Sequence, residues 1–268
     1  MSEQIAVQKD FIAVNGGQLA TVLKQSSNPV ADVVLVHGFT GSKEDFVKLS
    51  DLLAEMNFRV LSFDNRGQHE SSHFPSRADY SMNSIASDVI ALAKHYDLKS
   101  PHLFGHSLGG LIAQQATVLE PKLWRSLTLF CSGPGGKPDW FNDPQFVNLN
   151  NETKSDIWNS ILAPQHLENP KRELLQKRWL ASDANSTLAL HNHLKSFESK
   201  ISDIANFNIP AHVVYGDLDD VWPLEEQNAM AQELKAQITI LEGYGHCPNE
   251  ENPHLTAQAL AAFWKEVI

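Results

Sequence analysis

Two stretches near the start of the chain alternate apolar and polar residues, the pattern of a strand with one buried face. They cover residues 5–14 and 18–24, and Asn15, Gly16 and Gly17 lie between them. An Asn-Gly pair between two such runs is a strong signal for a β-hairpin. We therefore expect an antiparallel hairpin at one edge of a sheet.

Further along, short apolar runs alternate with segments whose apolar residues recur every three or four positions. The short runs, which predict strands, cover residues 33–36, 58–63, 103–104 and 127–131, and the first of them is fully apolar, as is typical of a strand buried on both faces. The other segments, typical of helices, cover residues 43–56, 84–95 and 111–118. This alternation indicates a doubly wound, mostly parallel sheet, which binds ligands at the carboxyl ends of its strands.

The alternation stops after residue 132 and resumes at residue 211. Residues 133–208 contain helical stretches but no clear strand, whereas two strands and two helices are predicted beyond them, over 211–215, 224–234, 238–241 and 255–267. We expect an α/β core of eight strands, made of residues 1–132 and 209–268, with residues 133–208 inserted as a helical cap.

One turn in this pattern carries a serine between two glycines. In residues 102–110, HLFGHSLGG, an apolar pair leads into Gly105, Ser107 and Gly109 and then into a helix. The pattern G-x-S-x-G fits a serine held on a sharp strand-to-helix turn, where larger residues at the glycine positions would collide with the strand and the helix. The helix N-terminus places the N–H of Leu108 where it can stabilise an oxyanion.

The predicted cap is rich in aromatic residues. Most of them are expected to form its core, and a subset facing the serine would line an apolar substrate pocket; they are Trp140, Phe141, Phe146, Trp158, Trp179 and Phe197. His191 and His193 are a poor metal site, because residues two apart on a helix point to different faces.

Composition narrows the partners and the compartment. The net charge of −11 argues against nucleic acid or an anionic membrane as the main partner. The expected partner is a small-molecule substrate. Cys131 and Cys247 have no metal-ligand spacing and are expected to be reduced thiols. Because we find neither a signal peptide nor an apolar run of ~18 residues, we predict a cytoplasmic protein without a membrane span. The sequence does not indicate an oligomeric state.

Acyl transfer requires a nucleophile, a base that takes its proton, and a group that orients the base. The chain offers these at predicted strand ends in the order Ser107, Asp219 and His246. Asp217 and Asp220 are rivals of Asp219 for the role of the acid. The order serine, acid, histidine is that of the α/β-hydrolase fold.

The whole chain, from about residue 5 to residue 268, resembles the α/β-hydrolase superfamily, in particular the carboxylesterase-like serine hydrolases with a helical cap. Beside the serine turn, the resemblance rests on an oxyanion loop, a D-x-R-G turn, a G-x-x-D-x-x-x-P acid turn and a G-H-x-x-x-x-E-x-P histidine loop. These motifs correspond to His37-Gly38-Phe39, Asp64 to Gly67, Gly216 to Pro223 and Gly245 to Pro253.

The resemblance implies a role for each candidate residue. Ser107 would be the nucleophile, His246 its base and Asp219, aligned with the acid of the motif, the residue that orients the base. The backbone N–H groups of Phe39 and Leu108 would form the oxyanion hole. No cofactor and no metal are implied.

Three further histidines adjoin these motifs. Many relatives continue the arginine turn as R-G-x-G-x-S, but here His69 replaces the second glycine, which should tighten the loop and bring a polar group near the cap. His37 is expected to shape the oxyanion loop through hydrogen bonds. His106 is expected to point away from its neighbour Ser107 and to serve packing.

The leading hypothesis is a hydrolase of carboxylic esters with an apolar acyl or alcohol part, acting through an acyl-enzyme. Three alternatives share the triad, namely a carbon–carbon bond hydrolase of the meta-cleavage type, a lyase of the menaquinone-pathway type and a cofactor-free haloperoxidase or perhydrolase. From a different class, a receptor could retain the fold and triad and turn over slowly.

Overall fold

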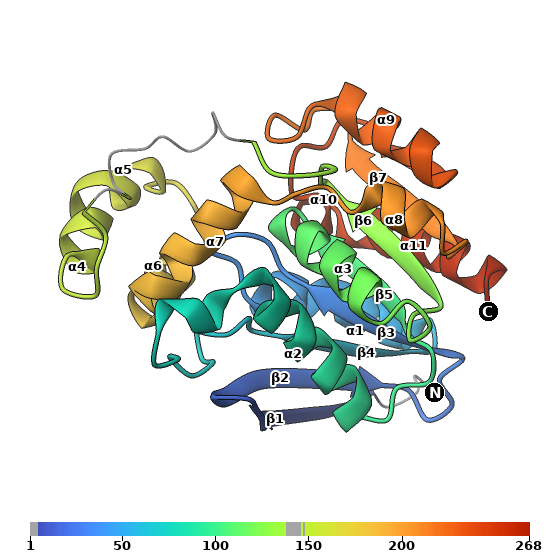
Figure 1. The fold of residues 1–268 in the computed structure, drawn as a ribbon, viewed down its shortest axis with the longest axis horizontal. Helices are drawn as coiled ribbons and strands as arrows, with labels where there is room; N and C mark the ends of the chain where they lie inside the picture. Colours follow the sequence, from blue (N-terminus) through green and yellow to red (C-terminus); the bar gives the residue numbers. More distant parts are fainter. Residues whose placement is uncertain (1–4, 138–145, 147) are drawn as a thin grey trace.

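The computed structural model describes residues 5–137, 146 and 148–268. Within them, eight strands form one sheet in the order β1-β2-β4-β3-β5-β6-β7-β8 (Figure 1). The strands are β1 (Ala6–Val14), β2 (Gly17–Gln25), β3 (Ala31–Val36), β4 (Phe58–Phe63), β5 (His102–His106), β6 (Ser126–Phe130), β7 (Ala211–Gly216) and β8 (Gln237–Leu241). The predicted fold class is confirmed.

The first two strands form the predicted hairpin at one edge of the sheet. β1 and β2 pair antiparallel, with Val14 opposite Gly17 next to the turn, and β2 pairs antiparallel with β4. From β4 to β8 all neighbouring strands are parallel. The carboxyl ends of these parallel strands therefore lie together at one end of the sheet, as the sequence predicted.

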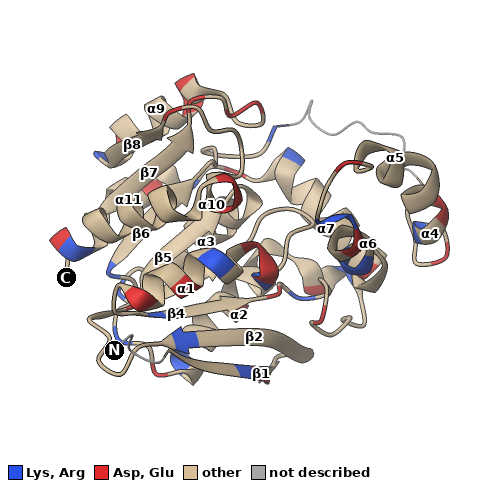
Figure 2. Cartoon of the chain, turned by 180° about the vertical axis from the view of Figure 1, so that it is seen from behind, with Lys and Arg blue, Asp and Glu red and all other residues tan. Residues whose placement is uncertain are grey.

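Helices cover both faces of the sheet. The views of Figures 1 and 2 place α1 and α11 on one face and α2 and α3 on the other. The core helices are η1 (Lys43–Phe46), α1 (Val47–Glu55), η2 (Arg77–Tyr80), α2 (Met82–His95), α3 (Leu108–Leu119), α9 (Leu224–Leu234), α10 (Pro248–Glu251) and α11 (Pro253–Glu266). The central strands β5 and β6 are buried along their whole length because both faces are covered.

The described residues between β6 and β7 are helical. They form α4 (Lys154–Ile157), the π-helical turn η4 (Trp158–Leu162), α5 (Ala163–Gln165), α6 (Arg172–Ala181), α7 (Ala184–Ser196) and α8 (Ile201–Ala205). α8 lies against the core helices α3 and α9, whereas α4 and α5 project beyond the sheet (Figure 1). The division into core and cap stays a prediction.

The predicted cap has a small apolar core separate from that of the sheet. It consists of the buried residues Leu149, Ile157, Trp158, Ala163, Trp179 and Ala184. Phe197, by contrast, packs in the main core. Trp140 and Phe141, two of the predicted cap aromatics, lie outside the described residues.

The described part of the chain has no helix that combines the length and the hydropathy needed to cross a membrane. Acidic and basic residues are interspersed along the helices in the view of Figure 2. Cys131 and Cys247 are both free thiols, as predicted.

Candidate active site

Ser107 occupies a strained turn between β5 and α3. Its φ of 54° and ψ of −121° lie in a region that residues other than glycine rarely adopt, which costs about 1–3 kcal/mol. The turn is tight because a Cβ on Gly105 would lie 2.2 Å from the carbonyl oxygen of Gly109. The steric reason inferred for the glycines is confirmed, and the strain keeps the serine at the apex.

The acid turn and the histidine loop meet at Asp219. Oδ1 of Asp219 accepts hydrogen bonds from His246 Nδ1 at 2.9 Å and from the N–H groups of Val221 and Trp222 at 2.9 and 3.2 Å. Gln227 Nε2 donates to Oδ2 at 3.2 Å. Burial alone would raise the pKa of Asp219, but these hydrogen bonds, led by that of His246, bring the pKa below its usual value.

The backbone on both sides of His246 is held by one carboxylate. Glu251 accepts hydrogen bonds from the N–H groups of Gly245 and Cys247, both at 3.0 Å. With Nδ1 bonded to Asp219, the other ring nitrogen of His246 is available to a substrate or a nucleophile. The histidine loop therefore leaves Nε2 of His246 as the ring nitrogen that is available for chemistry.

Ser107 and His246 line the same cavity, which has a volume of about 330 Å³. Gly38 and Phe39 line it too, and Gly38 lies against the serine, since a Cβ on Gly38 would be 3.2 Å from Cβ of Ser107. Leu108 is the first residue of α3 and directly follows the serine. The structure thus brings together all the residues that the sequence nominated.

Both the sequence and the fold are similar to those of known proteins. The model of the alpha/beta hydrolase family matches residues 33–259. The chain belongs to the alpha/beta hydrolase family. The predicted enzyme class, an α/β-fold hydrolase, is thereby confirmed.

Individual relatives are distant. The chain is 27% identical over 247 residues to Lipase 3 of Moraxella sp. (strain TA144), covering 86% of this chain and 76% of the lipase. A thermophilic esterase from Thermogutta terrifontis has the same fold, with a TM-score of 0.75 and 23% identity over 97% of this chain and 99% of that one. The enol-lactonase from Burkholderia xenovorans LB400 has a TM-score of 0.78 at 18% identity, over 96% and 100%.

In this alpha/beta hydrolase, His37 fixes the predicted oxyanion loop. Its Nδ1 is 2.8 Å from the carbonyl oxygen of Gly38 and its Nε2 is 3.0 Å from the N–H of Asn65. Since a carbonyl only accepts and an N–H only donates, the ring carries its proton on Nδ1 and is neutral. Burial lowers the pKa of His37, which keeps this form. The predicted structural role is supported.

A second cavity, of about 170 Å³, adjoins the first beneath the cap. Phe39, His166 and Leu175 line both cavities. The second cavity is mostly apolar, and its lining includes the cap aromatics Phe146, Trp158 and Trp179. Part of the predicted aromatic set therefore faces a cavity rather than only the core of the cap.

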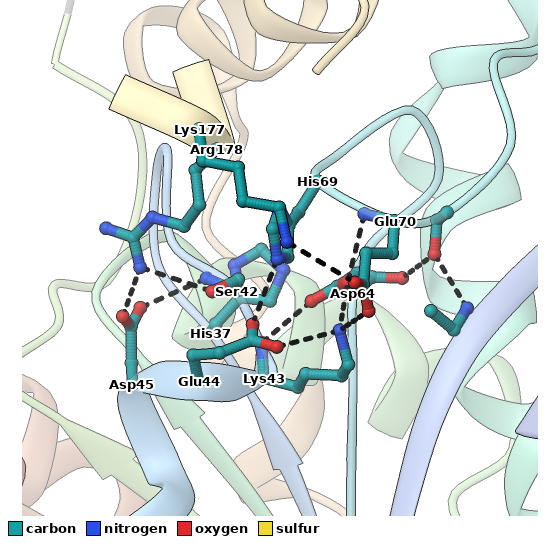
Figure 3. Close-up of polar contacts among 12 residues, drawn as sticks. His37, Ser42, Lys43, Glu44, Asp45, Asp64, His69, Glu70, Lys177 and Arg178 are labelled. Atoms are coloured by element: carbon teal, nitrogen blue, oxygen red, sulfur yellow. Dashed lines mark hydrogen bonds and ion pairs between the residues drawn. The ribbon is translucent and has the colours of Figure 1, made fainter. Parts of the chain in front are cut away.

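Charged side chains connect helix α6 of the predicted cap to the core beside the predicted oxyanion loop (Figure 3). Arg178 pairs with Asp45, and its Nη1 also donates to Ser42 Oγ at 3.2 Å. Lys177 lies 3.8 Å from Glu70. Arg178 lines the same cavity as Ser107, so this contact fixes α6 at the cavity wall.

His69 has φ of 46°, so it adopts the left-handed conformation that its glycine counterpart in relatives would adopt more easily. Its N–H donates to Ser182 Oγ of the cap at 3.0 Å, and Gln68 Nε2 donates to Ser186 Oγ at 2.8 Å. Both contacts join this loop to the predicted cap, but neither uses the imidazole of His69, whose Nε2 lies 3.6 Å from Glu44 of the core.

Two groups of described residues have metal-ligating atoms within 4.8 Å of one another. One is Cys131, Asp219 and His246, and the other is Glu44, Asp64 and His69. In the second group, the Lys43 ammonium lies 3.0 Å from Glu44 and 2.7 Å from Asp64 and supplies the positive charge (Figure 3). The absence of a metal cofactor stays a prediction.

Three residues of this site were missed or misjudged from the sequence. His106 does not serve packing alone, because its Nε2 donates to the carbonyl oxygen of His246 at 2.9 Å and its ring lines the catalytic cavity. Gln227 and Trp222 contact Asp219, and Trp222 also contacts Ser107. His106 and Trp222 occupy variable positions inside the motifs, and Gln227 lies close to one, which is the only signal that the sequence offered.

Proposed function

We propose that this enzyme hydrolyses carboxylic esters of small apolar substrates through an acyl-enzyme. His246 takes the proton of Ser107 as Oγ attacks the ester carbonyl, and the N–H groups of Phe39 and Leu108 stabilise the oxyanion. His246 then gives its proton to the leaving alcohol. A water molecule, deprotonated by the same imidazole, releases the acid and frees Ser107. Asp219 keeps His246 in the required tautomer.

The observation that carries this proposal is the hydrogen bond of 2.9 Å between His246 and the buried Asp219, in the wall of the cavity lined by Ser107. A carboxylate that accepts Nδ1–H favours a proton on that nitrogen and leaves the other nitrogen basic. The strained serine turn and the similarity to a lipase support the same chemistry.

The apolar cavity under the cap supports an apolar group on the substrate. It adjoins the cavity that Ser107 lines, since Phe39, His166 and Leu175 line both. An ester carbonyl at Ser107 could therefore extend an acyl chain past Phe39 toward Trp158 and Trp179, where burial is favourable by about 25 cal/mol per Å².

The carbon–carbon hydrolase and lyase alternatives act on carboxylate-bearing substrates and need a basic side chain in the cavity. Arg178 meets this requirement by position, since it lines the cavity. Its guanidinium, however, already pairs with Asp45 and hydrogen-bonds Ser42. Its charge is compensated, which favours a neutral ester as the substrate.

The test is hydrolysis of p-nitrophenyl esters of increasing acyl length by the wild type, by Ser107→Ala and by Ser202→Ala, an exposed serine on α8 that serves as the control. We expect the wild type and Ser202→Ala to share one preferred acyl length. Ser107→Ala should lose about 10³-fold or more of the activity.

Equal hydrolysis by the wild type and Ser107→Ala would contradict the proposed nucleophile. If none of the esters is hydrolysed but a fluorophosphonate labels Ser107, the carbon–carbon hydrolase, lyase, haloperoxidase or receptor alternatives become the better explanation. Labelling would then identify the serine independently of the substrate.

A further inference from the structure

Trp222 lies in the acid turn, and its indole group faces the nucleophile. Nε1 of Trp222 is 3.5 Å from Oγ of Ser107, in hydrogen-bonding geometry with the N–H as donor. The side chain is completely buried and is among the largest buried side chains of the molecule. An indole N–H can only donate, so the polarity of this contact is fixed.

Backbone and ring contacts hold the indole in place. The N–H of Trp222 donates to Asp219 at 3.2 Å, and its carbonyl oxygen accepts from Gln227 Nε2 at 3.0 Å. The six-membered ring lies against Gly133, where a Cβ would come within 2.1 Å of a ring carbon. The same residue thus anchors the acid and points a donor at the nucleophile, without freedom to turn away.

We propose that Trp222 is a further catalytic residue, whose indole N–H stabilises the negative charge on Ser107 Oγ when this oxygen leaves the acyl-enzyme. This inference rests on the proposed function. In that step, His246 takes a proton from water, and the water oxygen bonds to the acyl carbon. The bond from carbon to Oγ then breaks, its electron pair goes to Oγ, and His246 returns the proton to Oγ.

The effect should fall mainly on deacylation. In the free enzyme, the neutral Ser107 hydroxyl already accepts the hydrogen bond, so part of the interaction is present before the reaction starts. In the acyl-enzyme, Oγ is an ester oxygen and a poor acceptor, and it becomes a strong acceptor only as negative charge develops on it. An interaction that strengthens in the transition state accelerates the step.

The decisive variant is Trp222→Phe, which keeps an aromatic ring and removes the N–H. Stopped-flow hydrolysis of a p-nitrophenyl ester separates the burst of nitrophenol, which reports acylation, from the steady state, which reports deacylation. We expect the deacylation rate to fall by about tenfold, the acylation rate to change much less, and acyl-enzyme to accumulate.

A matched control is Trp264→Phe, because the indole N–H of Trp264 also makes a buried hydrogen bond, to Thr128 Oγ1 at 3.1 Å, away from the site. This variant should lose stability but keep the ratio of the two rates. All rates are normalised to the fraction of Ser107 that a fluorophosphonate titrates, so that misfolded protein is not counted.

Unchanged deacylation in Trp222→Phe, or an equal loss in both steps, would overturn the proposal and leave Trp222 a packing residue. If Trp222→Phe does not fold, Gly133→Ala tests the same point by displacing the indole, and normal deacylation there would overturn the proposal as well. Absence of any ester hydrolysis dependent on Ser107 in the wild type would instead contradict the proposed function itself.

Discussion

Asp217 and Asp219 belong to one turn but have different surroundings. Asp219 is buried and bonded to His246, whereas Asp217 is exposed and accepts the N–H of Gly243 at 2.6 Å. The two aspartates have the same side chain, so the difference between them lies in their surroundings alone. One is placed to orient the base, and the other fixes the start of the histidine loop.

We expect Asp219→Asn to lower kcat by about 10⁴-fold, because an amide no longer enforces the tautomer of His246 with a basic nitrogen toward Ser107. Asp217→Asn should have little effect, since the amide oxygen can still accept from Gly243. Steady-state kinetics of both variants on the same ester show which aspartate orients His246. The reverse order of losses would show that the wrong acid was chosen.

At this scale, the sequence could nominate Ser107, Asp219 and His246 because each lies in a motif with a known order. It could not identify Trp222 or His106 as partners of these residues. Their contacts depend on the direction of a side chain at a sharp turn, and spacing along the chain carries no information about that direction.

Among the secondary-structure elements, α7 is the helix that fastens the predicted cap to the arginine turn. The side chain of its N-cap residue, Asp183, accepts from the N–H of Asn185 at 3.1 Å and from the hydroxyl of Tyr80 at 2.6 Å. The N–H of Asp183 donates to the carbonyl oxygen of Gly67 at 2.7 Å. One residue thus combines a helix cap with an anchor to the core.

Asp183→Ala should lower the free energy of unfolding by about 2–3 kcal/mol, of which about 1 kcal/mol is the lost cap and the rest the buried Tyr80 hydroxyl without its acceptor. Asp183→Asn retains one oxygen acceptor, which can serve the cap or the Tyr80 hydroxyl but not both, and should cost less. Urea denaturation of the two variants measures the difference. Equal stabilities would contradict the anchoring role.

The elements of the core were predicted more accurately than those of the cap. Hairpin, strands and helices of the core follow hydrophobic periodicity, because every apolar stripe there faces one sheet. In the cap, apolar side chains face a cavity as well as a small core, and Trp158 begins a π-helical turn. The apolar residues of the predicted cap therefore do not follow one spacing along the sequence.

At the scale of the whole molecule, buried histidines make the free energy of unfolding depend on pH. Burial lowers the pKa of His37 and His193, and it lowers the pKa of His102 to about 3 and those of His106 and His212 to about 4. In the unfolded chain these groups titrate near ~6.5. Between about pH 6.5 and 4 the unfolded state therefore binds more protons than the folded state.

The free energy of unfolding should consequently fall as the pH decreases from about 6.5, by about 1.4 kcal/mol per pH unit for each additional proton bound on unfolding. His212→Gln should reduce this slope by about one proton, because residue 212 would no longer titrate. His254→Gln, at an exposed position, is the control. Denaturation curves between pH 5 and 7 with one common slope would contradict the prediction.

The order of the strands has a consequence for the synthesis of the protein. A chain leaving the ribosome exposes Ser107 long before Asp219 and His246, which follow β7 and β8, the last two strands to be made. Until those strands dock beside β6, the serine turn has neither its proposed base nor the indole of Trp222. A nascent or truncated chain would therefore be inactive, and hydrolysis would begin only once β7 and β8 have joined the sheet.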